Sequence, residues 1–255
     1  MTSLARLRHE LLAVSALSLC VPLWLLLPLS ATLARETPEN DVIKTSAGNL
    51  YVSCVGHGSL MFEFSGKVIH IDPWTKLGDY SRLPKADLIL VTHEHPDHLD
   101  AGAIQILRKE DTTVIANAAA GARISGSVVM TNGASMTCLG IQIEAVPAYN
   151  IANRNDKGSP WHARGNGNGY VLTFGDKRIY VAGDTENTPE LKSISNIECA
   201  FLPMNLPYTM TAEMVVDAAK AIRPKILYPY HTAGADATVL IQMLKGMEMD
   251  IRVRK

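Results

Sequence analysis

Residues Val91–Asp100, VTHEHPDHLD, carry three histidines and three acidic residues at the end of the apolar run LILV. Imidazole and carboxylate are the donor types that zinc and similar ions prefer. His93 and His95 are two residues apart, so an extended chain turns them to the same side, and Asp97 and His98 follow closely. A solvated polar turn is the alternative, but Asn, Gly or Ser would suffice for one. The stretch therefore predicts a metal site.

Four candidate ligands within six residues exceed what one loop usually offers to a single tetrahedral ion. Two ions that share the site are the simpler interpretation. His93 and His95 would then bind one ion, and Asp97 and His98 would bind the other. Such a pair needs further ligands, including one that bridges the two ions.

Two later strand-like runs also end in possible ligands. Asp184 follows KRIYVAG, where a helix-cap or turn aspartate is the alternative, and His231 follows KILYPY, where a lone histidine is more often structural. The His93 motif favours the metal interpretation for both residues. We expect Asp184 and His231 to join the same site.

The three motifs THEHPDHLD, AGDTE and YPYH together resemble the metallo-β-lactamase-fold hydrolase superfamily. The HxHxDH pattern is complete, and GHGSLMFEF…IDPW resembles the opening hairpin of that superfamily. The resemblance covers nearly all of residues 50–235. The short chain and the GH…DPW opening look closest to the branch of ascorbate-phosphate lactonase-like and uncharacterised metal-dependent hydrolases. The N-acyl phosphatidylethanolamine phospholipase D branch is somewhat similar.

The resemblance implies a ligand set in which Asp184 bridges the two ions. The implied ligands are His93, His95, Asp97, His98, Asp184 and His231. One further histidine is expected after IQIEAVPAYN, where this chain has Tyr149 and Asn150. The later His162, in SPWHARGNGNGY, is the favoured substitute, and the alternative is that Asn150 or a water completes the shell.

Several residues near these motifs have a structural and a functional interpretation. The resemblance places the Gly-His-Gly turn of His57 by the site, where a role behind the ligands or in substrate contact is one interpretation and a structural role is the other. Asp72 is expected to orient a ligand histidine, as carboxylates behind metal ligands do. His70 alternates within a strand and is expected to be structural. Four further side chains are expected either to line a substrate cleft or to pack elsewhere: Trp74, Trp161, Tyr208 and Met210.

The order of the predicted elements indicates an α+β fold. Apolar strand-like runs dominate first and then alternate with helices, and this happens twice along the chain, which predicts a four-layer αββα sandwich. Asp100 and Thr211 are expected to cap helices over 101–109 and 212–222, and 237–247 is expected to form a last helix. GHGSLMFEFSGKVIHID and GNGYVLTFGDKRIYVAGD share a layout, which either duplication or two ordinary hairpins explains.

The first 34 residues differ from the rest of the chain. Arg6 and Arg8 precede residues 11–34, which carry no charge and end in small residues, so we expect a secretory signal with Thr32 and Ala34 at the cleavage site. An uncleaved membrane anchor is the alternative, because the apolar run is nearly long enough to span a bilayer. The predicted organisation is a signal or anchor (1–34), a linker (35–46) and one hydrolase domain (47–255), exported to the periplasm or secreted.

Composition supports this organisation. With 47% hydrophobic residues the 255-residue chain can build one sizeable core, and a net charge of -1 gives no overall basic face for nucleic acid. After the signal three cysteines remain, without CxxC spacing, which favours buried free thiols at Cys54, Cys138 and Cys199.

The expected function is hydrolysis of an ester-type substrate, a lactone or a phosphodiester, by a metal-bound hydroxide. Asp97 is expected to orient the nucleophile or to transfer its proton. The cofactors are two divalent ions, with Zn²⁺ preferred over Mn²⁺ or Fe²⁺, and the partner is a small-molecule substrate; a membrane is a partner only if the N-terminal segment is retained. A class B-like β-lactamase and a non-catalytic metal-dependent binding protein are the alternatives.

Overall fold

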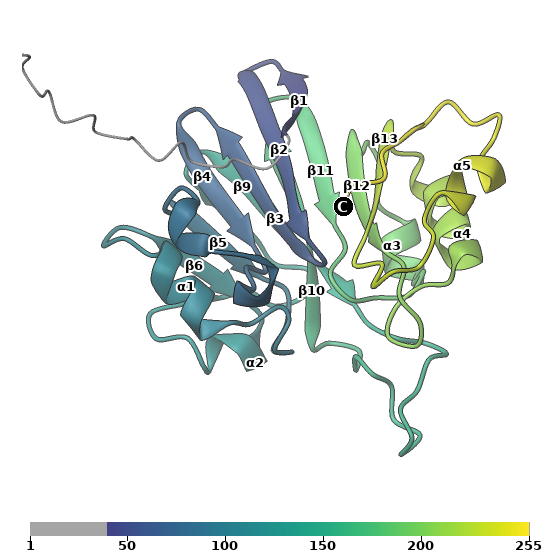
Figure 1. Ribbon diagram of the computed structural model, residues 1–255, viewed down its shortest axis with the longest axis horizontal. Helices are drawn as coiled ribbons and strands as arrows, with labels where there is room; N and C mark the ends of the chain where they lie inside the picture. Colours follow the sequence, from purple (N-terminus) through teal and green to yellow (C-terminus); the bar gives the residue numbers. More distant parts are fainter. Residues whose placement is uncertain (1–39, 255) are drawn as a thin grey trace, which may run out of the picture. The chain divides into compact units, whose positions relative to one another are not determined.

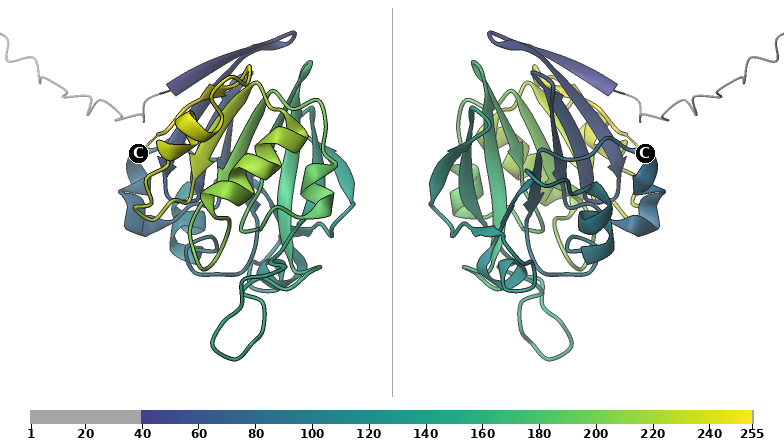
Figure 2. Two further views of the ribbon diagram at one scale, coloured as in Figure 1. Left: turned by 90° about the vertical axis from the view of Figure 1, so that its right-hand side faces the viewer. Right: turned by 90° about the vertical axis from the view of Figure 1, so that its left-hand side faces the viewer.

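The computed structural model describes residues 40–254, which form two seven-stranded mixed sheets packed face to face (Figures 1 and 2). The strands of the first sheet, in spatial order, are β1 (Asn40–Thr45), β2 (Gly48–Gly56), β3 (Ser59–Phe64), β4 (Lys67–Ile71), β5 (Leu88–Val91), β6 (Thr113–Ala116) and β7 (Val128–Val129). The strands of the second sheet, also in spatial order, are β8 (Ser135–Cys138), β9 (Ile141–Ala148), β10 (Gly167–Phe174), β11 (Lys177–Val181), β12 (Cys199–Pro203), β13 (Ile226–Tyr230) and β14 (Asp250–Ile251).

Short helices cover the outer face of each sheet. They are α1 (Ala101–Leu107), α2 (Ala118–Gly121), α3 (Pro189–Lys192), α4 (Ala212–Ile222) and α5 (Val239–Met243), with single 3₁₀ turns at Thr75–Leu77 and Tyr80–Arg82. Buried apolar side chains form three layers, one between the sheets and one under the helices on each side. The predicted αββα sandwich is therefore confirmed.

The two sheets repeat one topology. In the N-terminal half (β1–β7) the first four strands are antiparallel neighbours and the last three continue in parallel, and the C-terminal half (β8–β14) follows the same order. The two similar stretches of sequence fall on the equivalent hairpins β3–β4 and β10–β11. This agreement favours duplication over a chance recurrence of hairpins.

The predicted helix caps at the start of α1 and α4 are present. Asp100 accepts hydrogen bonds from the Gly102 and Ala103 backbone nitrogens, and Thr211 accepts one from Met214. The last helix is shorter than predicted, since α5 spans only five residues of 237–247. Its preceding residue Thr238 gives its hydroxyl to Asp236 rather than to the helix, and Gly246 has a φ of 89° that ends the helical path.

Part of the predicted linker is a strand. β1 pairs with β2 along its whole length, from Asn40 opposite Ser53 to Thr45 opposite Gly48. The remainder of the linker and the predicted signal or anchor lie outside the described residues. Within residues 40–254 no helix is both long and apolar enough to cross a membrane.

The predicted free thiols agree with the structure: Cys54, Cys138 and Cys199 are unpaired, although only Cys199 is fully buried. Burial raises the pKa of both Cys54 and Cys199 to about 12, so neither thiol is a nucleophile at neutral pH.

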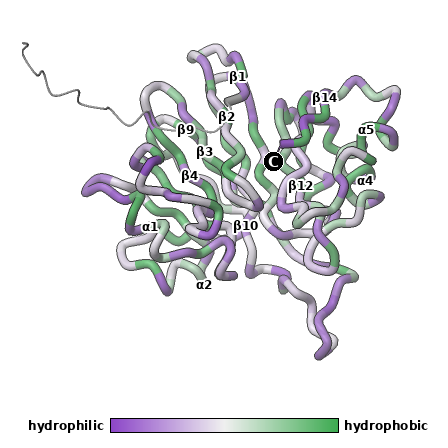
Figure 3. Tube along the Cα trace, viewed as in Figure 1, coloured by the Kyte–Doolittle hydropathy of each residue, from purple (hydrophilic) through white to green (hydrophobic). Residues whose placement is uncertain are grey.

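The parallel strands determine where the site forms. Strands β4–β6 of the N-terminal half all end at one edge of their sheet, and strands β11–β13 of the C-terminal half do the same in theirs, because parallel strands place their carboxyl ends together. Asp72 follows β4, the His93 motif follows β5, and Asp184 and His231 follow β11 and β13. The β9–β10 connection, which extends away from the sheets in Figure 1, is largely hydrophilic in Figure 3 and carries His162.

Candidate metal centre

The seven residues predicted as metal ligands gather in one cluster of two parts. The first compartment consists of His93, His95 and His162: Nδ1 of His95 lies 3.1 Å from Nε2 of His93 and 3.1 Å from Nε2 of His162. These three side chains come from two distant segments, the β5 loop and the β9–β10 connection. Their nitrogens face a common point, as three ligands of one ion would.

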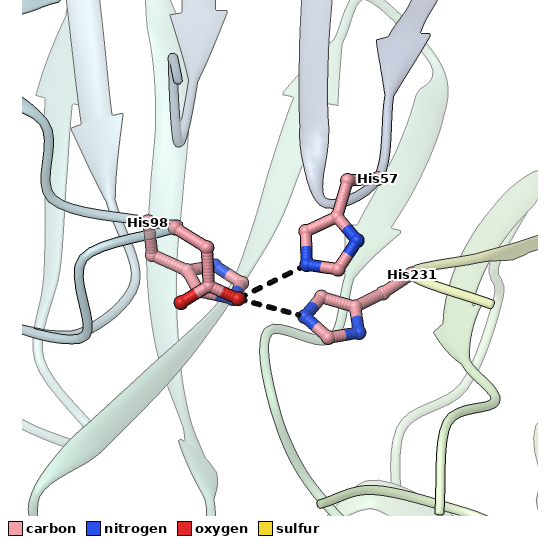
Figure 4. A group of neighbouring side chains, drawn as sticks. His57, His98 and His231 are labelled. Carbon is pink, nitrogen blue, oxygen red and sulfur yellow. Dashed lines mark hydrogen bonds and ion pairs between the residues drawn. The ribbon is translucent and has the colours of Figure 1, made fainter. Parts of the chain in front are cut away.

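The second compartment consists of Asp97, His98, His231 and His57. Oδ2 of Asp97 lies 3.0 Å from Nε2 of His57, 3.5 Å from Nε2 of His231 and 3.7 Å from Nε2 of His98. Figure 4 shows the His57 and His231 rings reaching this carboxylate from neighbouring segments. His57, placed beside the site by the sequence, is thus inside the cluster.

Asp184 lies between the two compartments and turns one oxygen to each. Its Oδ2 lies 3.3 Å from Nε2 of His162 and 4.0 Å from Nε2 of His93. Its Oδ1 lies 3.4 Å from Nε2 of His98 and 3.5 Å from Nε2 of His231. A carboxylate placed in this way has the geometry of a bridge between two cations.

Buried Gly183 and the buried Tyr230 hydroxyl set the position of Asp184. The preceding Gly183 has a φ of 64°, and a Cβ there would lie 2.9 Å from the Asn168 carbonyl oxygen and 3.1 Å from Thr92 Cβ. Its backbone N–H donates to the Tyr230 hydroxyl at 2.9 Å. Only glycine fits this turn without displacing its neighbours, so the chain after β11 is fixed where the carboxylate must face the histidines.

His162, and not Asn150, faces the first compartment. Asn150 Oδ1 accepts hydrogen bonds from the His162 backbone N–H at 2.8 Å and from His162 Nδ1 at 2.7 Å, which directs Nε2 toward His93 and His95. Asn150 Nδ2 donates to the Tyr208 carbonyl oxygen at 2.8 Å. Asn150 therefore orients the histidine.

Glu186 holds the start of the β9–β10 connection. This buried carboxylate accepts backbone hydrogen bonds from Ile151, Ala152 and Asn153 at 2.7–3.0 Å, and one from Asn150 Nδ2 at 3.2 Å. A carboxylate that satisfies three successive N–H groups fixes the backbone that carries Asn150. The sequence alone assigns no role to Glu186, although this residue lies two positions after Asp184 in AGDTE.

Asp72 lies behind His98, as the sequence predicts. Its Oδ2 is 2.8 Å from His98 Nδ1, and its carboxylate also accepts hydrogen bonds from the Thr92 backbone N–H and hydroxyl at 2.8 and 2.6 Å. Since Nδ1 of His98 donates to the carboxylate, Nε2 is directed toward the cluster. This is the arrangement of a carboxylate that orients a ligand imidazole.

Burial and charge divide the histidines by protonation. Burial lowers the pKa of His93 well below its ordinary value and that of His162 to about 4, so both imidazoles are neutral at pH 7. For His98 burial also favours the neutral form, but Asp184, Asp72 and Asp97 together raise its pKa to about 9. A strong negative potential therefore surrounds His98.

The two site carboxylates stay ionised. Burial opposes ionisation of Asp184, but the histidines around it, His231 and His98 foremost, lower its pKa far below the ordinary value. The pKa of Asp97 is likewise strongly depressed, against burial, by hydrogen bonds to His231 and His57. The cluster thus combines imidazoles with two ionised carboxylates, the donor types that bind divalent cations.

Three buried atoms of the cluster have no hydrogen-bond partner within the described part of the chain: His98 Nε2, Asp184 Oδ1 and His231 Nε2. A buried polar atom without a partner costs about 1–3 kcal/mol. Asp184 Oδ1 lies 3.4 Å from His98 Nε2 and 3.5 Å from His231 Nε2. A divalent cation would satisfy all of them at once, so the residues present fit a bound metal.

A cavity of about 460 Å³ opens over the cluster. Its walls include Trp74, Trp161 and Tyr208, with Trp161 and Tyr208 in edge-to-face contact at 4.7 Å. These three side chains line the cleft, one of the two positions expected of them. Met210 does not: it is fully buried in the layer under α4, so its interpretation as core is the correct one.

His70 is structural, as predicted. It is buried in β4, its Nε2 donates to the Pro84 carbonyl oxygen at 3.0 Å, and burial lowers its pKa to about 4. It lies among the apolar side chains of the outer layer, near Tyr80, and is not part of the metal cluster.

Comparison with protein families agrees with the geometry. A model described as the β-lactamase superfamily domain matches residues 51–231, which includes both compartments and Asp184. The chain belongs to the metallo-β-lactamase-fold hydrolase superfamily. The resemblance noted from the sequence, and with it the two-sheet fold, is therefore confirmed.

Relatives within the superfamily point the same way. A protein of Pelotomaculum thermopropionicum, described as a metal-dependent hydrolase, is 30% identical over 194 residues that make up 71% of this chain and 83% of the relative. A crystal structure of a metal-dependent hydrolase from Parabacteroides distasonis has 44% identity and a TM-score of 0.82, over 86% of this chain and 99% of that one. Igni18, a metallo hydrolase of Ignicoccus hospitalis, has 26% identity and a TM-score of 0.67, over 81% and 95%.

Proposed function

We propose that this protein hydrolyses an ester-type bond with two divalent ions, one in each compartment, that share Asp184. The observation that carries the proposal is the orientation of that carboxylate, with Oδ2 toward His162 and His93 and Oδ1 toward His98 and His231. Zn²⁺ is the preferred ion, because imidazole and carboxylate are donor types that it binds, and Mn²⁺ or Fe²⁺, which accept the same donors, are the alternatives.

The protein's own residues set up this chemistry. Asn150 and Asp72 hold His162 and His98 with their Nε2 atoms toward the cluster. Bound divalent ions supply Lewis acidity and lower the pKa of water to about 7. Asp97, the most exposed of the carboxylates at the site, borders the cavity, where its ionised oxygens are suited to orient water by accepting a hydrogen bond.

The cavity favours an uncharged ester, such as a lactone, over a phosphodiester. Aromatic rings form much of its wall, and its lining residues include no lysine or arginine. A phosphodiester would bring a negative charge into this cavity, where only the ions would compensate for it. Tryptophan and tyrosine rings instead fit a flat or apolar group beside the reacting carbonyl.

The experiment that tests the function combines metal loading with a substrate panel. Purified protein is depleted with a chelator, reloaded with Zn²⁺, Mn²⁺ or Fe²⁺, and assayed on lactones, aryl esters, phosphodiesters and a β-lactam. We expect metal-dependent turnover that is fastest on lactones or aryl esters. Two bound ions without turnover on any of the four classes would contradict catalysis and support a metal-dependent binding protein; β-lactam turnover alone would support the β-lactamase alternative.

Asp97→Asn tests the residue assigned to orient the water. The substituted amide keeps the shape of the side chain but loses its negative charge, so we expect the turnover to fall by about 10²-fold or more. The comparison with Asp156→Asn, an exposed carboxylate of the β9–β10 connection, controls for loss of charge alone. An Asp97→Asn variant with full metal content and full activity would contradict the assignment.

We further propose that the protein is exported, with residues 1–34 cleaved as a signal. The proposal rests on the basic start and the uncharged apolar run of that segment. Expression of the full chain in a bacterium, followed by fractionation and N-terminal sequencing, tests it: a mature end near Arg35 supports cleavage, and an intact Met1 in the membrane fraction supports the anchor.

A further inference from the structure

His57 contributes a side chain to the second compartment that the ligand set drawn from the sequence does not contain. It lies in the turn between β2 and β3, and its ring is largely buried, with 16% of the side chain exposed. Its Nε2 is one of four donor atoms that lie within 4.8 Å of one another, together with atoms of Asp97, His98 and His231. The ring borders the cavity over the cluster.

The distances in the second compartment suit a shared ion. Two ligands about 2.0–2.1 Å from one metal lie roughly 2.9 Å apart at a right angle and about 3.4 Å apart at the tetrahedral angle. His57 Nε2 lies 3.0 Å from Asp97 Oδ2, and His231 Nε2 lies 3.5 Å from the same atom. His57 is thus spaced as a neighbouring ligand would be (Figure 4).

The backbone of the turn is built to bring this ring inward. His57 adopts a φ of 47°, which non-glycine residues rarely do, immediately after a register shift in β2. A Cβ on the next residue, Gly58, would lie 2.9 Å from His98 Cε1 and 3.4 Å from His231 Cδ2. The absence of a side chain at Gly58 lets the turn approach both rings.

The turn is also tied to His231. The backbone carbonyl oxygen of His57 accepts a hydrogen bond from the His231 N–H at 2.9 Å, and the two ring centroids lie 3.7 Å apart. His231 has a φ of 49° and belongs to the other half of the molecule. Two strained residues from opposite halves therefore hold each other at the same compartment, and such strain is often found where function requires it.

The repeated topology gives His57 a counterpart. The β2–β3 turn of the N-terminal half is equivalent to the β9–β10 connection of the C-terminal half, and that connection carries His162. His162 lies in the first compartment, among residues of the N-terminal half, and His57 lies against His231 of the C-terminal half. Each half thus sends one histidine, from the same place in its sheet, toward ligands that include residues of the other half.

We propose that His57 is a ligand of the ion in the second compartment, as the counterpart of His162 in the first. The inference rests on the proposed pair of ions. The first compartment then has three histidines and Asp184, and the second has His57, Asp97, His98, His231 and Asp184. Because the second compartment offers more donors and two carboxylates, a chelator removes the first-compartment ion before the second.

The direct test counts the histidine ligands in the wild-type protein. In the Co²⁺-loaded protein every ligand imidazole with an exchangeable ring N–H gives a resonance shifted far outside the normal range. We expect six such imidazoles, those of His57, His93, His95, His98, His162 and His231. Five shifted resonances, with that of His57 in the normal range, would show that His57 only donates a hydrogen bond to Asp97 and would overturn the inference.

Variants provide an independent readout of metal affinity. We expect His57→Ala to weaken the binding of one of the two ions by about tenfold or more, and His162→Ala to weaken the binding of the other. Each variant should also remove a different shifted resonance. Trp74→Phe, whose ring packs 5.2 Å from that of His57, is the matched control and should keep both ions. If His57→Ala bound two ions with unchanged affinities, the inference about His57 would be overturned but the proposed function would stand. If the wild-type protein bound fewer than two ions, the proposed function would be overturned.

Discussion

The two halves of this molecule share a topology but contribute to the site in different ways. The N-terminal half supplies four candidate ligands from one short motif after β5, within six residues of sequence. The C-terminal half supplies three, and each comes from a different segment: the β9–β10 connection, the end of β11 and the end of β13. One scaffold therefore supports a local motif in one copy and a dispersed set in the other, because both sheets bring their strand ends to one edge.

Equivalent strand ends also carry different roles. Asp72 follows β4 and lies behind His98, at 2.8 Å from Nδ1, whereas Asp184 follows β11 and faces histidines with both oxygens. The difference indicates that a carboxylate at this edge can either orient one histidine from behind or face two groups of histidines at once.

The largest expected effect comes from the residue that joins the compartments. Asp184→Ala removes the shared carboxylate, so we expect both ions to be weakened and turnover to fall by about 10³-fold or more, which corresponds to about 4 kcal/mol. Metal content and steady-state rates on the preferred ester check this. The exposed Asp156→Ala serves as the control and should lose neither ion. Loss of one ion only would show that Asp184 belongs to a single compartment.

The next effect concerns the core between the halves. Phe174 in β10 is fully buried against Phe62 and Phe64, so Phe174→Ala should lower the free energy of unfolding by about 3 kcal/mol. Phe64, near the same end of β3, is only half-buried, and Phe64→Ala should cost less. Urea unfolding measures the loss of unfolding free energy in each variant. Equal losses in the two variants would contradict the difference in burial between Phe174 and Phe64.

A matched pair of supporting residues separates the compartments. Asp72→Ala should weaken the second-compartment ion, and Asn150→Ala the first-compartment ion, each by about 10–100-fold, since each residue orients one histidine. Titration of the chelator-treated proteins with Zn²⁺ gives both affinities. If either variant weakened the two ions equally, the compartments would not be independent.

The smallest effect is at the contact between β1 and the C-terminal residues. Burial opposes ionisation of Asp41, but Arg254, Tyr228 and Arg252 lower its pKa below the ordinary value of 3.8. A carboxyl with a lowered folded-state pKa stabilises the fold above about pH 4, and this contribution is lost as the pH falls through the folded-state pKa. Asp41→Asn should therefore cost up to about 1 kcal/mol at pH 7 and progressively less as the pH falls below 3.8. A loss that is the same at pH 7 and pH 3 would contradict an ionic origin.

The sequence predicted most of the fold and of the site because both depend on local patterns. Apolar runs gave the strands, and polar donors at their ends gave the candidate ligands, which parallel strands then bring together. The polar composition of residues 35–46 predicts a linker where β1 forms, and only Ile43 of the described side chains of β1 is fully buried. Its stability comes from pairing with β2, which a local pattern does not show.

The remaining features depend on contacts between distant segments. The sequence placed His57 near the site but could not show that it meets Asp97, forty residues away. In the sequence Asn150 and His162 are alternatives for the same ligand position, whereas in the structure Asn150 orients His162. Met210 follows a cavity residue closely in sequence, but the chain turns it into the layer under α4. Each outcome depends on the path of a loop, which neither composition nor periodicity specifies.

The measurement that tests the central claim most directly is a crystal structure of the metal-loaded protein with anomalous data at the absorption edge of the metal. The account predicts two peaks, one between His93, His95 and His162 and one between Asp97, His98 and His231, with Asp184 Oδ2 bound to the first ion and Oδ1 to the second. A single ion, or two ions with Asp184 bound to only one of them, would contradict it.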